Sequence, residues 1–204
     1  MKRYKVNVVA MFLVLSTLVG CAGKIRYPSY YTLNLPSPPD PPPQEGAHAV
    51  LAVREFRSPA YLRQGSLVYR LSPEEVGFYN FHRWAVDPRE FVTNAIKEHL
   101  QASGNFAQVR NYDGHSDFDY VLTGRLERLE EVDYEGGIKV AVAISAQMTS
   151  LASGTTVWTN EVSESGIVER RDMPAVVSEM DRTLDRAIAK LLNPAPNPTA
   201  HVGK

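Results

Sequence analysis

Apolar side chains recur with two different periods along this chain, and the two periods separate helices from strands. Apolar residues three or four positions apart predict a helix over 87–102 and a second helix over 173–192. Strict alternation of apolar and polar residues predicts strands over 118–132, 138–149 and 155–162. These three strands follow one another across short turns, so we expect them to form an antiparallel meander.

Both predicted helices carry sequence signals at their ends. Asp87 is suited to an N-cap, Pro88 to the first turn and Glu90 to the third helical position. Pro194 ends the second helix, because proline lacks the backbone N–H that a helix interior requires. We expect the Pro-rich tail over 193–204 to be disordered.

Shorter apolar stretches predict further strands over 30–33, 50–56, 66–71, 76–79 and 106–109. The order of strands, helix, short strand, meander and helix indicates an α+β fold. We expect a single domain over 30–192, with a mainly antiparallel sheet and both helices packed on one face. Residues 36–43 include six prolines, which favour polyproline II, so they predict a stiff loop or spacer. A ligand for a polyproline-binding domain is the alternative interpretation of this segment.

The composition narrows the class of protein. The 204 residues include 22 Lys and Arg against 23 Asp and Glu, and the formal net charge of −1 excludes a nucleic-acid binder driven by overall basicity. The single Cys excludes an intrachain disulfide framework and a Cys-rich zinc site.

The chain lacks common catalytic and nucleotide-binding motifs, including GxSxG, GxGxxG, the P-loop and HExxH. Its five His have no spacing that builds a metal site. Residues 113–117 could hold a cation or a general base, but their Asp and Gly are typical of a solvated turn, which is our interpretation. A solvated strand end is indicated by a run of carboxylates, namely Glu127, Glu130, Glu131, Asp133 and Glu135. We therefore expect no enzymatic activity, no catalytic residue, no cofactor and no metal.

The first twenty residues have the pattern of an export signal. Basic residues at the start precede an apolar stretch over 8–19, which is too short to span a membrane. The segment ends at Gly20 and Cys21, and small residues before a Cys resemble the bacterial lipobox. This resemblance implies cleavage between Gly20 and Cys21 and lipidation of Cys21, with residues 21–29 as a lipidated tether. An ordinary signal peptide over 1–20 is the alternative.

The residue after Cys21 bears on the destination of the lipoprotein. It is Ala22 rather than Asp, and by analogy with enteric bacteria the chain is expected at the periplasmic face of the outer membrane. The mature chain retains 19 Lys and Arg against 23 Asp and Glu, a balance of −4. This balance argues against a basic patch that binds anionic lipid.

The middle of the chain carries a recognisable string of residues, which runs through Leu67-Val68-Tyr69-Arg70, Val76, Phe78-Tyr79, His82-Arg83-Trp84-Ala85 and Pro88. Together with Tyr31-Thr32-Leu33 after the lipobox, it resembles the ABC-type transport auxiliary lipoproteins, the family of paraquat-inducible protein C. The resemblance extends from Cys21 to about Leu192, which is nearly the whole mature chain.

The resemblance implies a non-enzymatic protein that works beside an ABC transporter. Its partners would be an MCE-domain periplasmic protein and the ABC permease and ATPase, and its acyl chains would hold it on the membrane. The cargo would be lipids or other hydrophobic molecules moving between the two membranes. A ring-like homo-oligomer is a further implication. The alternative function is an outer-membrane lipoprotein that binds peptidoglycan or a cell-wall synthase.

Three residues near the centre of the string are predicted to contact the partner. Trp and Arg are the side chains that most often anchor protein interfaces, so we select Tyr79, Arg83 and Trp84. The alternative for Trp84 is a place in the hydrophobic core.

Overall fold

The structure is a computed structural model that describes residues 26–39, 47–115, 117–134 and 136–198. The predicted signal peptide, the predicted lipidation site Cys21 and the second half of the Pro-rich segment lie outside the described residues. So does the end of the tail over 199–204.

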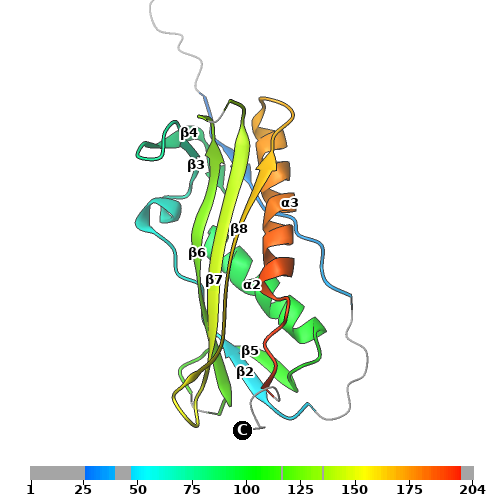
Figure 1. The fold of residues 1–204 in the computed structure, drawn as a ribbon. Coiled ribbons are helices and arrows are strands. Elements are labelled where there is room, and N and C mark those ends of the chain that lie inside the picture. Colours follow the sequence, from blue (N-terminus) through cyan, green and yellow to red (C-terminus); the bar gives the residue numbers. More distant parts are fainter. Residues whose placement is uncertain (1–25, 40–46, 116, 135, 199–204) are drawn as a thin grey trace, which may run out of the picture.

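The described residues form one sheet, a short 3-10 helix and two α-helices (Figure 1). The helices are η1 (Ala60–Arg63), α2 (Pro88–Ala102) and α3 (Met173–Leu191). The strands are β1 (Ser29–Tyr31), β2 (Val50–Val53), β3 (Ser66–Arg70), β4 (Val76–Trp84), β5 (Gln108–Asn111), β6 (Tyr120–Val132), β7 (Lys139–Ser150) and β8 (Thr156–Ile167).

The longest strands form the predicted meander. β6 pairs with β7 along its whole length, from Tyr120 opposite Ser150 to Val132 opposite Lys139. β7 pairs in turn with β8, which continues five residues past the predicted end at residue 162. The extension has few apolar side chains, so alternation does not reveal it, but pairing with the first half of β7 keeps it extended.

The other edge of β6 is shared by two short strands that run parallel to it. Leu51 of β2 pairs with Tyr120 at one end, and Tyr69 of β3 pairs with Glu131 at the other. β1 is also parallel to its neighbour β4. The sheet is therefore mixed, although its longest ladders are antiparallel as expected.

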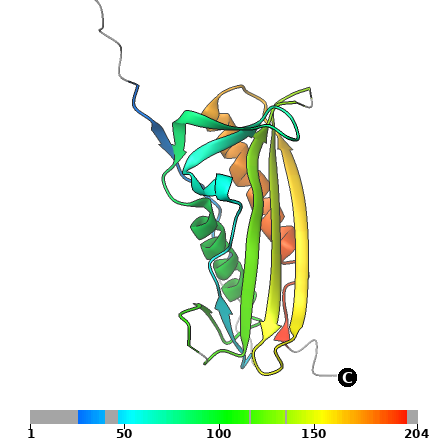
Figure 2. The same cartoon turned by 90° about the vertical axis from the view of Figure 1, so that its left-hand side faces the viewer.

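Both helices cover the same face of the sheet, and the core lies between the two layers (Figures 1 and 2). Leu126 and Ile144 of the sheet are fully buried, as are Ile96 of α2 and Leu184 of α3. The predicted cap of α2 is confirmed, because the Asp87 carboxylate accepts a hydrogen bond from the Arg89 backbone N–H at 2.9 Å. An α+β single domain is thus confirmed. Among the described residues, no helix has the length and apolar character needed to cross a membrane.

The segments that flank the domain are attached to it by side-chain hydrogen bonds. On the N-terminal side, the Asn34 backbone N–H donates to Asp181 of α3 at 2.9 Å. Beyond α3, the Trp158 indole N–H donates to the Pro194 carbonyl at 3.2 Å, and Asn105 donates to the Pro196 carbonyl at 3.2 Å. Residues 193–198 therefore pack on the domain, although the sequence predicted disorder from residue 193, because their backbone carbonyls find donors that are distant in the sequence.

Candidate functional site

The three residues predicted to contact a partner all lie on β4, at the end of the sheet where the described chain begins (Figure 2). The sequence predicted that this strand would end at residue 79, but it continues to Trp84. The extension exists because β1 pairs with it in parallel, from Ser29 opposite His82 to Tyr31 opposite Trp84. Each paired residue of β1 is 53 positions away from its partner on β4, and such a distant strand cannot be inferred from local alternation.

An irregularity in β4 changes which side chains are exposed. On β3, Val68 pairs with Phe78 but Ser66 pairs with Arg83, so β4 contains extra residues between these two positions. Bulges of this kind bend a strand and redirect its side chains. Phe81 is consequently 42% exposed. The spacing of the aromatic residues in this part of the sequence does not predict that its side chain faces solvent.

Tyr79 belongs to a cluster of three Tyr rings, one His ring and one carboxylate on β1, β3, β4 and β6, which we call the Tyr–His cluster (Tyr31, Tyr69, Tyr79, His82 and Glu131). The Tyr79 ring centroid lies 4.8 Å from that of Tyr69 and 5.6 Å from that of His82. The Tyr31 hydroxyl lies 3.0 Å from Nδ1 of His82. The Tyr79 hydroxyl donates to Oε2 of Glu131 at 2.9 Å. The cluster therefore connects the edge strand β1 to the long strand β6.

The Tyr–His cluster changes the acidity of two of its members. Burial raises the pKa of Tyr79, and its hydrogen bond to the Glu131 carboxylate raises that pKa further. Burial also raises the pKa of Glu131, although the hydrogen bond from Tyr79 opposes this rise. Tyr79 is therefore a constant hydrogen-bond donor at physiological pH, and burial disfavours the ionised form of the Glu131 carboxyl group.

Replacing Glu131 with Gln should change how stability depends on pH. A carboxyl group whose pKa is raised by folding stabilises the fold fully below its unfolded value of about 4.3, and this contribution is lost as the pH rises through the folded value. The amide keeps an acceptor for Tyr79 without a charge. Relative to the wild type, Glu131→Gln should thus gain stability between pH 4 and pH 7, measured by urea denaturation at both values. Exposed Glu161→Gln is the control, and an equal shift in both variants would contradict the prediction.

Arg83 and Trp84 have different surroundings. One Arg83 guanidinium nitrogen donates to the Gln64 carbonyl at 3.0 Å, so the side chain reaches the loop that follows η1. Trp84 is only 7% exposed and packs within the hydrophobic core. The structure thus places Arg83 next to the loop that follows η1. It places Trp84 in the hydrophobic core, which was the alternative for this residue. Contact of these residues with a partner stays a prediction.

The carboxylate run on β6 is less solvated than the sequence indicated. Glu131 is buried below Tyr79, and the Glu130 side chain has no exposed surface. Oε1 of Glu130 accepts from Nε of Arg70 at 2.6 Å and also pairs with Arg128 at 2.7 Å. Its other oxygen, Oε2, has no hydrogen-bond partner among the described residues. The expectation of a solvated strand end was wrong for these two residues, because β3 and β4 fold against the end of β6 and cover it.

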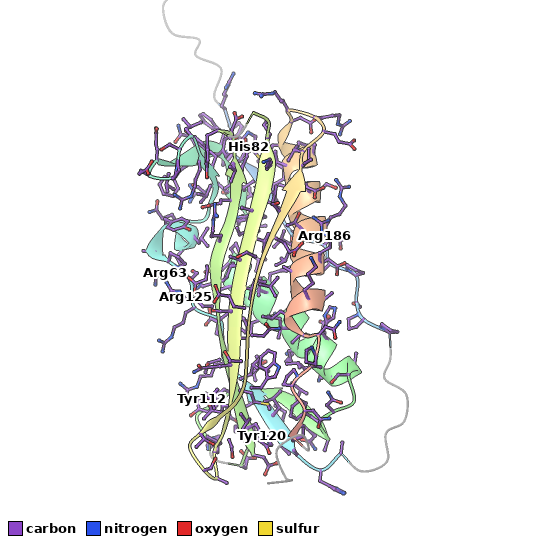
Figure 3. The ribbon with its side chains drawn as sticks, viewed as in Figure 1. Arg63, His82, Tyr112, Tyr120, Arg125 and Arg186 are labelled. Atoms are coloured by element: carbon purple, nitrogen blue, oxygen red, sulfur yellow. The ribbon has the colours of Figure 1, made fainter. Side chains whose placement is uncertain are left out.

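A groove of about 390 Å³ lies on the sheet face opposite the helices. Thr123 and Arg125 line it, and they alternate along β6 with the buried Leu122 and Leu126. Arg54 and Arg57 also line the groove, and Arg54 stacks on the Tyr112 ring at 4.0 Å. Figure 3 labels Tyr112 and Arg125. Guanidinium groups of this kind can bind an anionic group. The sequence does not reveal this groove, because its arginines come from segments about 70 residues apart.

The remaining candidate for chemistry was the segment 113–117. Its Asp113 carboxylate accepts a hydrogen bond from the His115 backbone N–H at 3.0 Å, which is the local bond of a turn. Within the described residues, no three His, Cys, Asp or Glu side chains form a group that could hold a metal ion.

Comparisons with known proteins give a family and a fold. A family model described as ABC-type transport auxiliary lipoprotein component matches residues 31–191. A crystal structure of a Xanthomonas campestris protein of the DUF330 family superposes with a TM-score of 0.68 at 16% identity, over 80% of this chain and 92% of that one. A second crystal structure, of an uncharacterized protein, has a TM-score of 0.63 at 16% identity, over 83% and 99% of the two chains. A comparison with curated protein sequences gives no significant match.

Proposed function

We propose a function that starts from the family of this chain, which belongs to the ABC-type transport auxiliary lipoproteins. The protein is an outer-membrane-anchored periplasmic subunit. It assists an ABC transporter with an MCE-domain protein in moving lipids or other hydrophobic molecules between membranes, and it does so by docking the MCE-domain protein. The observation that carries the proposal is the family match over 31–191, which spans the domain from β1 to the end of α3.

The sequence before the domain supports the anchoring part of the proposal. Cys21 is the only Cys of the chain and stands where a lipobox requires it, and Ala22 favours transfer to the outer membrane. Acyl chains on Cys21 would gain about 0.8 kcal/mol for each buried CH₂, so three chains hold a protein permanently on a membrane.

The docking part of the proposal rests on β4 and the loop beside it. Arg83 donates to the Gln64 carbonyl, and the residue before Gln64 is Arg63, which ends η1 and is exposed. Arg is frequent at interface hot spots, because its planar group forms several directed hydrogen bonds. We assign the direct contact to Arg83, while Tyr79 and Trp84 hold β4 in place from the buried side.

A pull-down from membranes tests the proposed docking. The chain is tagged at its carboxyl end, membranes are extracted in mild detergent, and co-purifying proteins are identified by mass spectrometry. We expect an MCE-domain protein with its ABC subunits. Arg83→Ala should reduce their recovery about tenfold, a loss of about 1.4 kcal/mol in binding.

Three controls make this result specific. Arg110→Ala removes a surface arginine on the distant strand β5, so it should leave recovery unchanged. Cys21→Ala tests whether anchoring matters, and the size of the purified complex tests whether the chain forms a ring. Recovery of cell-wall enzymes in place of transporter subunits would reject the proposal in favour of the peptidoglycan-binding alternative.

A further inference from the structure

Exposed aromatic side chains gather where the described chain begins. Tyr27 is 79% exposed and Tyr30 is 62% exposed. Exposed apolar side chains that lie together, unlike single ones, mark sites of interaction with proteins or membranes. Tyr30 of β1 pairs with Arg83 of β4, and the exposed Phe81 precedes Arg83 by two residues. Arg26 lies over the Phe81 ring at 6.0 Å, so the tether itself contributes a basic group to this set.

Two more exposed apolar side chains lie at the same end of the sheet. Backbone pairing joins Arg70 of β3 to Val132, Val132 to Lys139, and Lys139 to Ile167 at the end of β8. Ile167 is exposed, and so is Leu71, which directly follows Arg70. Figure 1 shows that β8 ends on the side of the molecule from which the described chain starts. We call this set the aromatic end (Tyr27, Tyr30, Leu71, Phe81 and Ile167).

Basic side chains accompany the aromatic end. Arg170 and Arg171 lie in the loop between β8 and α3, and both are well exposed. Their carboxylate partners, Asp172 and Asp133, are also partly exposed, so these ion pairs are weak and free to open. Long basic side chains next to Tyr and aliphatic residues are the combination found at the boundary between lipid and water.

The length of the tether brings the aromatic end close to the lipid. Only five peptide steps separate Cys21 from Arg26, and they span at most about 18 Å when fully extended. If Cys21 carries acyl chains, Arg26 cannot lie farther than this from the membrane surface. Ser29, where β1 begins, is three steps further along the chain, so its limit is about 29 Å. The exposed aromatic side chains are thus in the part of the molecule that the tether holds nearest to lipid.

We propose that the aromatic end rests in the interfacial layer of the leaflet that holds the acylated Cys21. This inference rests on the proposed lipid anchor and adds a defined orientation to it. Tyr presents an apolar ring and a polar hydroxyl, so it is stable where headgroups meet acyl chains. The long axis of β6, β7 and β8 then points away from the membrane. Since β6 has 13 residues at about 3.3 Å each, the turn after β7 extends about 40 Å into the periplasm.

Spin labels on the acylated full-length protein test this orientation in vesicles of phosphatidylethanolamine and phosphatidylglycerol at 3:1. Acylation blocks the thiol of Cys21, so a cysteine introduced at an exposed site is labelled alone. Asn80→Cys places the label beside Phe81 and keeps every residue of the aromatic end, while Ala152→Cys places it in the turn after β7. Both positions are exposed in the free chain.

The readout is collision of the label with membrane-dissolved oxygen and with a water-soluble nickel chelate. We expect the nickel accessibility at position 80 to be at least about threefold lower than at position 152, with oxygen accessibility higher. Adding Tyr30→Ser and Phe81→Ser to the Asn80→Cys variant should remove most of this difference, because the side chains that reach the lipid are gone.

Each other outcome overturns the inference in a recognisable way. Equal accessibility at positions 80 and 152, with intact acyl chains on Cys21 by mass spectrometry, rejects the membrane contact and leaves the proposed function in place. Shielding of position 80 only after a periplasmic transporter protein is added shows that a protein covers the aromatic end. Absence of acyl chains on Cys21 rejects the anchor, and the inference with it.

Discussion

Replacing Trp84 with alanine should lower the free energy of unfolding by about 3–5 kcal/mol. The Trp84 side chain is 7% exposed within the main hydrophobic cluster, and its strand joins β1 to the rest of the sheet. Truncation removes the transfer free energy of the ring and leaves a cavity that the paired backbone of β4 cannot close. Because many domains have a total stability of only about 5–15 kcal/mol, this single change should shift the unfolding midpoint strongly.

Urea denaturation of the Trp84→Ala variant measures this loss of stability. Binding to the purified partner at low temperature, where the variant stays folded, shows whether the ring also contacts the partner directly. Phe81→Ala is the matched control, because it removes an exposed aromatic ring from the same strand. Its cost should be within about 0.5 kcal/mol. If Trp84→Ala proved as stable as the wild type but did not bind the partner, the ring would be a direct contact and its assignment to the core would be wrong.

Replacing Arg70 with methionine should cost about 3–5 kcal/mol, because it leaves a charge without its main partner inside the protein. The Glu130 side chain has no exposed surface, and Arg70 donates to it at 2.6 Å. Arg128, the second partner, is 40% exposed and holds the same carboxylate oxygen. It therefore offsets only part of the loss.

A double variant distinguishes this explanation from simple loss of packing by Arg70. Arg70→Met combined with Glu130→Leu removes both members of the pair, so most of the lost stability should return, since an apolar pair can replace a buried ion pair at little cost. Arg125→Met is the control, because its pairing with Glu127 is at the surface and should contribute less than about 1 kcal/mol. A double variant no more stable than Arg70→Met would show that the carboxylate is not the source of the cost.

The variants Trp84→Ala and Arg70→Met bear on function, because Trp84 and Arg70 both help to hold β4 and its neighbours in place. These strands lie at the end of the sheet that carries the candidate docking residue. Arg70 and Tyr79 cover the end of β6, and Trp84 closes the core below β1. Variants of these residues are expected to affect docking by loosening the support of Arg83. Arg83→Ala is expected to affect docking while the domain stays folded. Measuring stability and binding together is therefore necessary for each variant.

The predicted elements agree best with the structure where the spacing of apolar residues within one helix or strand is enough to define that element. The helices expected over 87–102 and 173–192 are found at Pro88–Ala102 and Met173–Leu191. Their apolar stripes face one core, and capping side chains define where they begin, as the Asp87 and Asp172 carboxylates do. The meander of β6, β7 and β8 was predicted equally well, because apolar and polar residues alternate along each strand and the next strand follows after a short turn.

The sequence by itself determined the family, the two helices and the meander, because each of these depends on patterns carried by short segments of the chain. Lipidation at Cys21 stays a prediction. Only the tertiary structure decided how far β4 extends, since the strand that pairs with its second half is β1. It also decided that Glu130 and Glu131 are buried, because Arg70 and Tyr79, more than fifty residues earlier, cover them. Exposure and charge pairing are properties of distant residues brought together, and the candidate docking surface, the groove and the aromatic end all consist of such residues.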